Sequence, residues 1–499
     1  MFMKKSRRLQ NLIENLREFK KSRLGMFGLL VLLVFTVIAA FDRSIAPYDP
    51  NPLNRVHPPF CAPSWASIFD REAFPTSQMV EDPAFQSDKN WVFFTTYENI
   101  KGVIHHSSNS STYIISFVDN DVKYSSRAHY AFIETHFNWS YSRPPSDVEI
   151  NFWVRCESSG DYMFGDYEVY VALAPSNYTR EWFLAYLPKL IKENIVILPR
   201  DVTDFGILVG KLSSKEPHWR PVKLDLNLLP ILAIFRFKEI SLRFVLFIKE
   251  VKQSPMGTIS IEIAQPKLIA YSYYFGILGT SDSGADVFSQ LICGARISLL
   301  IGVISALISV AIGVFIGLFS GYYGGIVDEI LMRIVDFLLI IPTLPLMMVL
   351  AAMLQKSIWS IIAVLAMFLW LGTARLIRSQ VLTEKSKAYV EAAKIAGASD
   401  FYIIFRHILP NVLPTVFVQI TTGISGAILS EAGLSFLNLG PAEVSWGRML
   451  QWAFEHAALT RGAWWYVFPP GLCITLLSLS FIFIGYTIDR ILNPRLRRR

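Results

Sequence analysis

Long apolar runs are the feature that most constrains this chain. A helix that crosses a bilayer needs about 20 predominantly apolar residues. The 499 residues contain six candidate spans, at about 24–41, 297–319, 326–354, 358–377, 413–434 and 465–488. The second holds Gly313 and Gly317, a small-residue pair that favours close helix packing, and the third is broken by Pro342 and Pro345. The sequence predicts a membrane protein with six helices.

Composition agrees with this prediction, since 52% of the residues are apolar and only 17% are charged. The chain is too long for six spans alone, so a sizeable soluble part is also expected. A signal peptide is the competing interpretation of residues 24–41. It is disfavoured because no small-residue cleavage site follows Phe41.

Basic residues predict the orientation, because Lys and Arg accumulate on the cytoplasmic side of membrane proteins. They cluster in the N-terminal segment 1–23, in the loop after the fourth span and in the tail 489–499. Six crossings place all three clusters on one side. We therefore expect both termini in the cytoplasm, residues 42–275 outside it, and no nucleic-acid partner. The clusters comprise Lys4, Lys5, Arg7, Arg8, Arg17, Lys20, Lys21, Arg23, Arg375, Arg378, Lys385, Lys387, Lys394, Arg406, Arg495, Arg497, Arg498 and Arg499.

The long polar region 42–275 contains alternating apolar residues typical of strands. We predict an inserted β-rich domain over about 70–274, of sandwich type. The apolar residues that carry the pattern are Val148, Ile150, Phe152, Val154, Ile240, Leu242, Phe244, Leu246, Ile248, Ile259, Ile261 and Ile263, and Tyr113–Val118 and Tyr167–Leu173 are further candidates.

The residues of this insertion do not reveal its function. Asn109, Asn138 and Asn177 begin Asn-x-Ser/Thr sequons, which matter only if that face is glycosylated. The pair His105-His106 has no evident partner. Cys61 and Cys156 can form a disulfide outside the cytoplasm. The insertion either docks a solute-binding protein or serves as a spacer or envelope contact, and both alternatives stay open.

The polar segment 378–412 lies between the fourth and fifth spans. Within it, YVEAAKIAGASDFYIIFRHILPN runs from Tyr389 to Asn411. Ala, Glu and Lys favour helix, Gly397 suits a bend and Pro410 begins the next element. Such a segment predicts a helix–turn–helix that presents a docking surface. A solvated loop without a partner is the simpler alternative.

This segment resembles the EAA loop of ABC-importer permeases, which packs into a groove of a separate ATPase subunit. The match rests on Glu391, Ala392, Ala393, Gly397, Leu409 and Pro410. His407 departs from the general pattern, but Arg406 to Asn411 is similar to the dipeptide/oligopeptide subfamily. The resemblance implies that the coupling residues are Tyr389, Glu391, Ala392, Ala393, Gly397, Ala398, Ser399, Arg406, His407, Leu409 and Pro410.

Residues 1–68 and 276–499 resemble the same subfamily, including IAPYDPN at 45–51 and AWWYVFPP at 463–470. It also resembles the segment 276–296, where Gly279, Thr280, Asp286 and Arg296 are kept. Ser281 and Ala285 stand where the family has Asp and Arg. From the residues themselves, this segment predicts a short amphipathic helix at the outer interface, capped by Asp282.

Three ionisable residues fall at membrane depth. Arg333 and Asp336 share a helix face and are expected to form a structural pair near the inner interface, with a role in transport as the alternative. Glu431 lies near the outer end of the fifth span, where a carboxylate is costly and usually faces protein or a water-filled cavity. The family has a similar run, so Glu431, with Ser430 and Thr422, is placed on the translocation pathway. A surface carboxylate that reaches the headgroups is the alternative.

The resemblance implies a type I ABC-importer permease fold of six transmembrane helices, in the second permease subunit of a peptide importer. The implied partners are a sister permease, two ATPase subunits and an external solute-binding protein. No Gly-x-x-x-x-Gly-Lys-Ser/Thr run is present, so we expect ATP and Mg²⁺ on the partners, and neither a cofactor nor catalysis here. The alternatives are import of another solute, such as an oligosaccharide or nickel chelate, and a membrane-anchored receptor; an exporter is disfavoured.

Overall fold

The computed structural model divides the chain into two compact units, Met1–Ala62 with Gly276–Arg499, and Pro63–Phe275. The structure describes residues 17–70, 77–81, 91–95, 100–106, 111–119, 129–139, 141, 145–160, 167–175, 207–212, 220–225, 239–248 and 257–492. The predicted basic residues at 4–8 and 495–499 and the sequon residues Asn109 and Asn177 lie outside these ranges.

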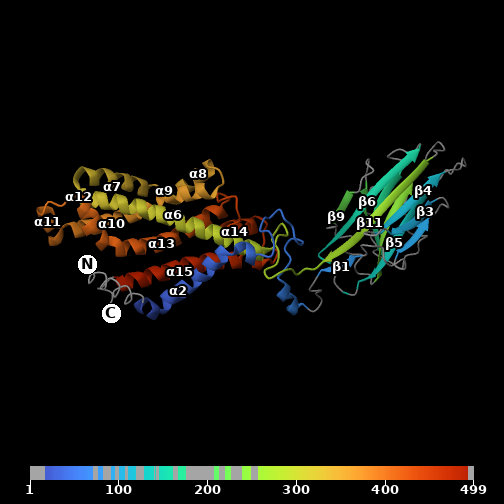
Figure 1. Ribbon diagram of the computed structural model, residues 1–499, viewed down its shortest axis with the longest axis horizontal. Coiled ribbons are helices and arrows are strands. Elements are labelled where there is room, and N and C mark those ends of the chain that lie inside the picture. The colour runs from blue at the N-terminus through green and yellow to red at the C-terminus, as the bar shows by residue number, and fades with distance from the viewer. Residues whose placement is uncertain are drawn as a thin grey trace. The chain divides into compact units, whose positions relative to one another are not determined.

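The first unit is built of helices that run side by side along most of its length (Figure 1). The long ones are α2 (Arg23–Ala40), α6 (Val287–Tyr323), α10 (Trp370–Lys385), α13 (Leu409–Phe436) and α15 (Phe468–Leu492). The shorter ones are α3 (Asp42–Ile45), α7 (Gly325–Ile340), α8 (Thr343–Met353), α9 (Ile358–Phe368), α11 (Ala388–Ile395), α12 (Asp400–Ile403) and α14 (Trp446–Glu455). A π-turn spans Ile404–Ile408, and a 3₁₀ turn spans Trp464–Tyr466.

Among the residues that the structure describes, five helical segments are long and apolar enough to cross a membrane, and α7 with α8 makes a sixth span if that bent pair counts as one. The two halves of the pair meet at 86°, where the sequence places Pro342. The predicted interfacial helix of segment 276–296 is wrong. Its residues from Val287 onward are the first turns of α6, which continues without a break for 37 residues.

A row of glycines lets α6 pack closely on α10. Cβ atoms built at Gly313, Gly317 and Gly321 would lie 2.7–3.0 Å from their nearest atoms on α10, among them the Ala374 carbonyl oxygen. The pair that the sequence singled out, Gly313 and Gly317, is therefore part of a row of three glycines with a four-residue repeat. Small residues at this spacing bring helix backbones together.

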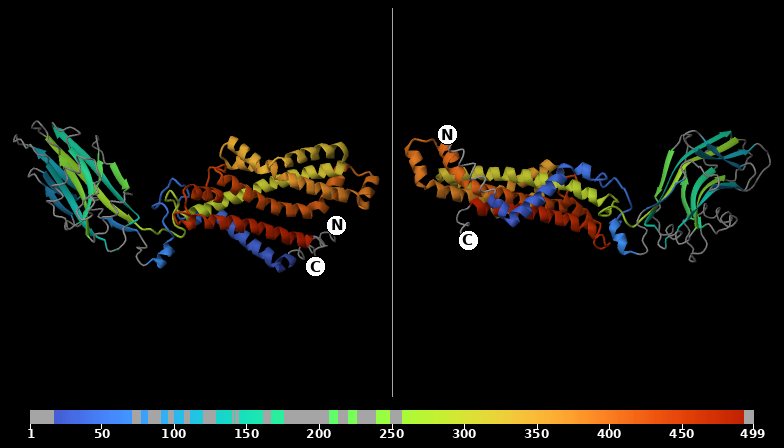
Figure 2. Two further views of the ribbon diagram at one scale, coloured as in Figure 1. Left: turned by 180° about the vertical axis from the view of Figure 1, so that it is seen from behind. Right: turned by 60° about the horizontal axis from the view of Figure 1, so that its bottom comes forward.

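The first span packs on the last in the same manner, and α2 and α15 lie together in both views of Figure 2. A Cβ at Gly28 would lie 2.7 Å from the carbonyl oxygen of Ser480. The hydroxyl of Ser22, which caps α2, forms a hydrogen bond of 3.1 Å with the hydroxyl of Thr487 in α15. The sequence around Arg23–Ala40 thus forms an integral helix of the unit.

The predicted pair of Arg333 with Asp336 is wrong. Asp336 instead accepts a hydrogen bond from Arg375 of α10, and Arg333 lies 3.8 Å from Glu329, one turn earlier in α7. Nearby, Arg378 donates two hydrogen bonds of 2.5 Å to Asp328. Helix spacing alone could not reveal these partners, because they depend on which face of α10 lies against α7.

Two segments that flank the second unit in sequence are joined in the first unit. The amide of Thr280 donates to the Cys61 carbonyl (2.9 Å), and the Thr280 hydroxyl donates to Pro58 (2.6 Å). The amides of Val56 and Phe60 donate to Gly284 and Ser281. A Cβ at Gly279 would lie 2.3 Å from the Cys61 carbonyl oxygen, so glycine is required there. We call these contacts between 56–61 and 279–284 the seam.

The second unit begins with a 3₁₀ turn, Ser64–Phe69, and contains two antiparallel sheets. One has the order β3-β4-β11-β6-β9, with β1 paired to β11, and the other has the order β2-β5-β10-β7-β8 (Figure 1). The strands are β1 (Gln78–Glu81), β2 (Trp91–Thr95), β3 (Ile100–His106), β4 (Ser111–Asp119), β5 (His129–Asn138), β6 (Asp147–Gly160), β7 (Tyr167–Pro175), β8 (Ile207–Leu212), β9 (Arg220–Asp225), β10 (Glu239–Ile248) and β11 (Gly257–Tyr271).

The two sheets of this unit face each other. Phe152 of β6 and Phe244 of β10 meet with ring centroids 4.9 Å apart, and both are buried. The apolar residues of the sequence pattern that have described side chains, from Val148 to Val154, Ile240 to Phe244 and Ile259 to Ile263, are all buried. Alternation therefore assigned the inner face of both sheets correctly.

The disulfide between Cys61 and Cys156 is not formed. Cys61 is a buried thiol, and its sulfur lies 3.2 Å from Nδ1 of His57. Cys156 lies within β6, where its backbone pairs with Ile261. The two cysteines belong to different units, which composition could not show.

We predict that Gly317→Ala destabilises the helical unit. The added methyl must separate α6 from α10, and overpacking of this kind costs about 1–3 kcal/mol. Thermal unfolding of the purified chain in detergent should show a lower Tm. Gly372→Ala in α10 is the matched control, because a Cβ there meets nothing within 4 Å and alanine favours helix. Equal behaviour of the two variants would contradict the close packing.

The seam should make stability depend on pH. Burial first, and the positive charge of Arg55 second, lower the pKa of His57 from 6.5 to about 3. The unfolded chain then binds more protons between these values, so stability is full above pH 6.5 and falls as the pH is lowered. The expected loss at pH 5.5 is about 1–2 kcal/mol of unfolding free energy.

The measurement is Tm at pH 7.5 and at pH 5.5 for wild type, His57→Asn and His407→Gln. The drop in Tm should shrink in His57→Asn, whose amide keeps a polar atom near Cys61. It should persist in His407→Gln, a control at the other end of the unit. An undiminished drop in His57→Asn would show that His57 does not cause it.

Candidate functional site

The connection from α10 to α13 is a compact corner of short helices. It runs through α11, a turn at Gly397, α12 and the π-turn, and enters α13 at Leu409, with Pro410 in the first turn of that helix. Figure 1 shows α11 and α12 at the end of the helical unit away from α14. The helix, bend and helix predicted from the sequence are all present in this order.

Gly397 ends α11 in a Schellman motif. Its φ is +78°, its amide donates to the carbonyl of Lys394 (3.0 Å), and the Ala398 amide donates to the carbonyl of Ala393 (3.0 Å). A Cβ at Gly397 would meet nothing within 4 Å, so its backbone conformation, rather than a lack of space, requires glycine. Ser399 then caps α12 by accepting from the amide of Tyr402.

The inner side of the corner is packed against the membrane helices. Val390, Ile403 and Ile408 have no exposed surface and lie in one core cluster with Leu318 of α6 and Ile377 of α10. Ala393, Ala398 and Leu409 pack at the edge of the same cluster. The corner is therefore fixed to the helices, which a solvated loop without tertiary contacts is not.

The outer side of the corner is bare. Glu391, Ala392, Gly397 and Arg406 are exposed, and Ile395 and Phe401 expose 88% and 59% of their surfaces. Exposed apolar side chains that gather on one face are a common feature of interaction surfaces. We call these six residues the outer face.

A tyrosine of α6 ties the middle of the corner to the membrane helices. Tyr322 donates a hydrogen bond of 2.6 Å to Asp400, the first residue of α12. The ammonium of Lys394 lies 5.3 Å from the centre of the same ring, a cation–π contact from α11. One side chain at the end of α6 thus contacts both arms of the corner. Sequence reasoning missed this contact, because it joins residues almost 80 positions apart.

A second tyrosine braces the ends of the corner. Tyr389 donates to Glu384 of α10 (2.6 Å) and accepts from the side-chain amide of Asn411 in α13 (2.9 Å). Burial first, and then the hydrogen bond to Glu384, raise the pKa of Tyr389 to about 12. His407 lies between the rings of Tyr389 and Tyr402, with centroid distances of 6.2 and 5.5 Å. This histidine, which departs from the general pattern, therefore contributes to the aromatic packing.

The three predicted pathway residues separate in the structure. Thr422 is exposed and Ser430 is half-buried, whereas Glu431 has no exposed surface. Glu431 accepts hydrogen bonds from Ser435 (2.6 Å) and from Ser298 of α6 (3.4 Å). The alternative of a surface carboxylate is wrong. The described contacts give Glu431 a structural role between α13 and α6, and its place on the pathway stays a prediction.

The four residues that the sequence analysis singled out in segment 276–296 make structural contacts in this chain, and a role at a gate stays a prediction. Gly279 and Thr280 form the seam, and Arg296 lies 3.4 Å from Asp42 in an ion pair. The cap of α6 is Asp286, which accepts from the amide of Ser289 (2.9 Å); burial raises its pKa. The predicted cap, Asp282, instead accepts from Tyr466 (3.0 Å) and pairs with His456.

The chain is similar in sequence to known transport proteins. Residues 313–498 match the family described as binding-protein-dependent transport system inner membrane component, and residues 12–59 match the N-terminal transmembrane domain of oligopeptide transport permease C. The dipeptide transport system permease protein DppC of Bacillus subtilis is 35% identical over 58% of this chain and 88% of its own length. DppC of Escherichia coli K12 is 44% identical over 44% of this chain and 74% of its own length.

Among solved structures, the chain aligns with an inward-facing form of the MetNI methionine ABC transporter at a TM-score of 0.34. The identity is 18%, over 41% of this chain and 94% of the other. The sequence matches cover both the first span and the region of the corner. The chain belongs to the family of binding-protein-dependent transport system inner membrane components, among its DppC/OppC-like ABC-transporter permeases.

Proposed function

We propose that this chain is one of two membrane subunits of an ATP-driven importer of di- and oligopeptides, and that its outer face docks an ATPase subunit. The observation that carries the proposal is the contrast between the two sides of the corner, packed inside and bare outside. The names of its relatives support peptides as the cargo.

The partners in this proposal are a sister permease, two ATPase subunits that hold ATP and Mg²⁺, and an external solute-binding protein. ATP binding draws the ATPase subunits together and carries the corner with them. The helices then rock between inward- and outward-facing states around a site between the two permeases. This works only if ATP binds the closed state more tightly than the open state.

The proposed orientation places the corner and both termini in the cytoplasm. Lys385, Lys387, Lys394 and Arg406 lie in or beside the corner, consistent with the positive-inside rule. Since α2 crosses the membrane once from a cytoplasmic N-terminus, residues 42–275 lie outside the cytoplasm. The paired sheets of Pro63–Phe275 are then an external domain inserted into the permease.

Coupling requires that a displacement of α11 reach the membrane helices. The described contacts offer two connections: Lys394 and Asp400 to Tyr322 of α6, and Tyr389 to Glu384 of α10 and Asn411 of α13. The small side chains of Ala392 and Ala393 permit close approach, and the turn at Gly397 sets the angle between the arms. The corner would therefore move as one rigid piece.

The test of function is purification of the chain from its native membranes in mild detergent, with mass spectrometry of the proteins that accompany it. Recovery of a sister permease and two P-loop ATPases is the expected result. A chain recovered with envelope proteins but no ATPase would overturn the assignment and favour a membrane-anchored receptor.

Gly397→Val should release the ATPase subunits, whereas Gly397→Asn should retain them. Both side chains fit the open space, but a β-branched residue at φ +78° costs about 1–2 kcal/mol, and asparagine tolerates this region. The expected loss of co-purified ATPase in the valine variant is roughly 5- to 30-fold. Equal loss in both variants would show that side-chain bulk, not backbone geometry, decides docking.

Tyr389→Phe should uncouple transport from ATP hydrolysis. The ring and its packing remain, but the hydrogen bonds to Glu384 and Asn411 are lost. Peptide imported per ATP hydrolysed, measured in proteoliposomes, should fall roughly fivefold, because elements of this kind contribute about 0.5–2 kcal/mol to coupling.

The matched control is Tyr402→Phe, a tyrosine on the same corner whose hydroxyl makes no hydrogen bond among the described residues. Its ratio of peptide to ATP should equal that of wild type. If Tyr389→Phe also retained the wild-type ratio, the brace would be a feature of stability alone.

A further inference from the structure

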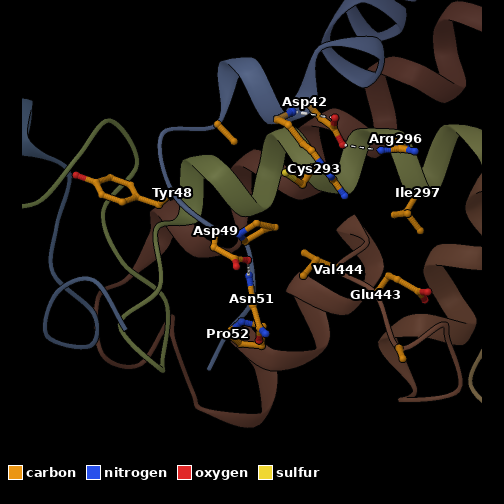
Figure 3. Close-up of a pocket in the computed structure, with 14 residues that line it drawn as sticks. Asp42, Tyr48, Asp49, Asn51, Pro52, Cys293, Arg296, Ile297, Glu443 and Val444 are labelled. Atoms are coloured by element: carbon orange, nitrogen blue, oxygen red, sulfur yellow. Dashed lines mark hydrogen bonds and ion pairs between the residues drawn. The ribbon is translucent and has the colours of Figure 1, made fainter. Parts of the chain in front are cut away.

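At the opposite end of the helical unit from the corner lies a cavity of about 740 Å³ (Figure 3). Three segments line it: residues 42–52 after α2, the stretch 293–297 of α6, and the loop 442–444 before α14. Its volume falls in the range of small-molecule sites, about 300–1,000 Å³. Ile297 and Val444 form apolar parts of its wall. Five charged side chains also line it: Asp42, Arg43, Asp49, Arg296 and Glu443.

Three of the charged groups already have partners. Asp42, which is largely buried, forms an ion pair with Arg296, drawn as a dashed line in Figure 3. Asp49 accepts hydrogen bonds from the amide of Asn51 and the side chain of Asn54, each 2.9 Å long. These contacts hold the 42–52 segment in shape, so this wall is organised without a ligand.

Two charges of opposite sign remain. The guanidinium of Arg43 and the carboxylate of Glu443 both line the cavity, and neither makes a hydrogen bond or a close ion pair with the described residues; the charge of Arg448, which lies outside the cavity lining, acts on Glu443. They come from separate segments, one after α2 and the other before α14. A ligand that satisfied both would carry an oxyanion for Arg43 and an ammonium group for Glu443.

We propose that this cavity binds a zwitterion, a small molecule with an ammonium group and an oxyanion at opposite ends. Two sources have this chemistry. One is a short peptide with free termini, which rests on the proposed function. The other is the phosphoethanolamine headgroup of a lipid, which does not, and which suits a cavity that begins two residues after the apolar span ends at Ala40.

The test uses the complete permease–ATPase complex in nanodiscs, without the solute-binding protein. One arm measures equilibrium binding of radiolabelled dialanine against N-acetyl-dialanine amide, which lacks both charges. The other arm counts, by native mass spectrometry, the phosphatidylethanolamine retained from mixtures with phosphatidylglycerol. The variants are Arg43→Gln and Glu443→Gln, and Arg43→Lys preserves the charge.

Each glutamine variant should weaken one of the two zwitterions about 10-fold or more, the value of one charge-assisted hydrogen bond. Arg43→Lys should stay close to wild type. The controls Arg461→Gln and Glu455→Gln remove the same charges outside the cavity and should change neither arm. Which arm responds identifies the source.

The proposal is overturned if wild type binds neither zwitterion in preference to its comparator, or if both glutamine variants bind as wild type does. The ATPase subunits retained in each preparation report on the proposed function separately, because the corner that docks them lies at the other end of the unit. Failure of the cavity and failure of the permease assignment therefore give different results.

Discussion

The close contact of α6 with α10 is the interaction on which the helical unit depends. The three glycines of the row leave room for the backbone of α10, and Tyr322 follows directly after the last of them. The row therefore sets how far the end of α6 lies from α12, and so where its hydroxyl meets Asp400. In a bilayer, where apolar side chains gain little from leaving lipid for protein, such backbone proximity is a main source of helix association.

The contact of α6 with α10 also bears on the difference between the two sides of the corner, which is packed on its inner side and exposed on its outer face. Apolar residues such as Ile403 and Ile408, five positions apart across the π-turn, have a fixed surface of α6 and α10 to pack against. Those on the opposite face, such as Ile395, have no such surface among the described residues. A docking surface needs both properties, because a partner can move only what is already rigid.

Much of this arrangement was predictable from the sequence. Apolar length identified the spans, Pro342 marked the sharp break, and alternation separated the inner and outer residues of the strands. These signals are local and depend on periodicity alone. The bend at Gly397 was also predicted, because few other residues adopt a positive φ at the end of a helix.

Other features required the tertiary structure. The partners of Asp336 and Tyr389 depend on the rotation of neighbouring helices, which no spacing rule provides. The amphipathic stretch after Asp286 suggested an interfacial helix, but its apolar stripe packs within the unit and continues into α6. The sequence did not indicate that Arg43 and Glu443 line one cavity, because they are 400 positions apart.

The seam has a consequence for how a domain of roughly 200 residues can sit inside a permease. Hydrogen bonds from Thr280 and Phe60 hold the chain just before the insertion against the chain just after it. For the helical unit, the insertion is therefore a loop whose two ends are held together by the seam. Because the entropy of closing a loop rises only with the logarithm of its length, replacing a short connection by a folded domain changes the stability of the permease little.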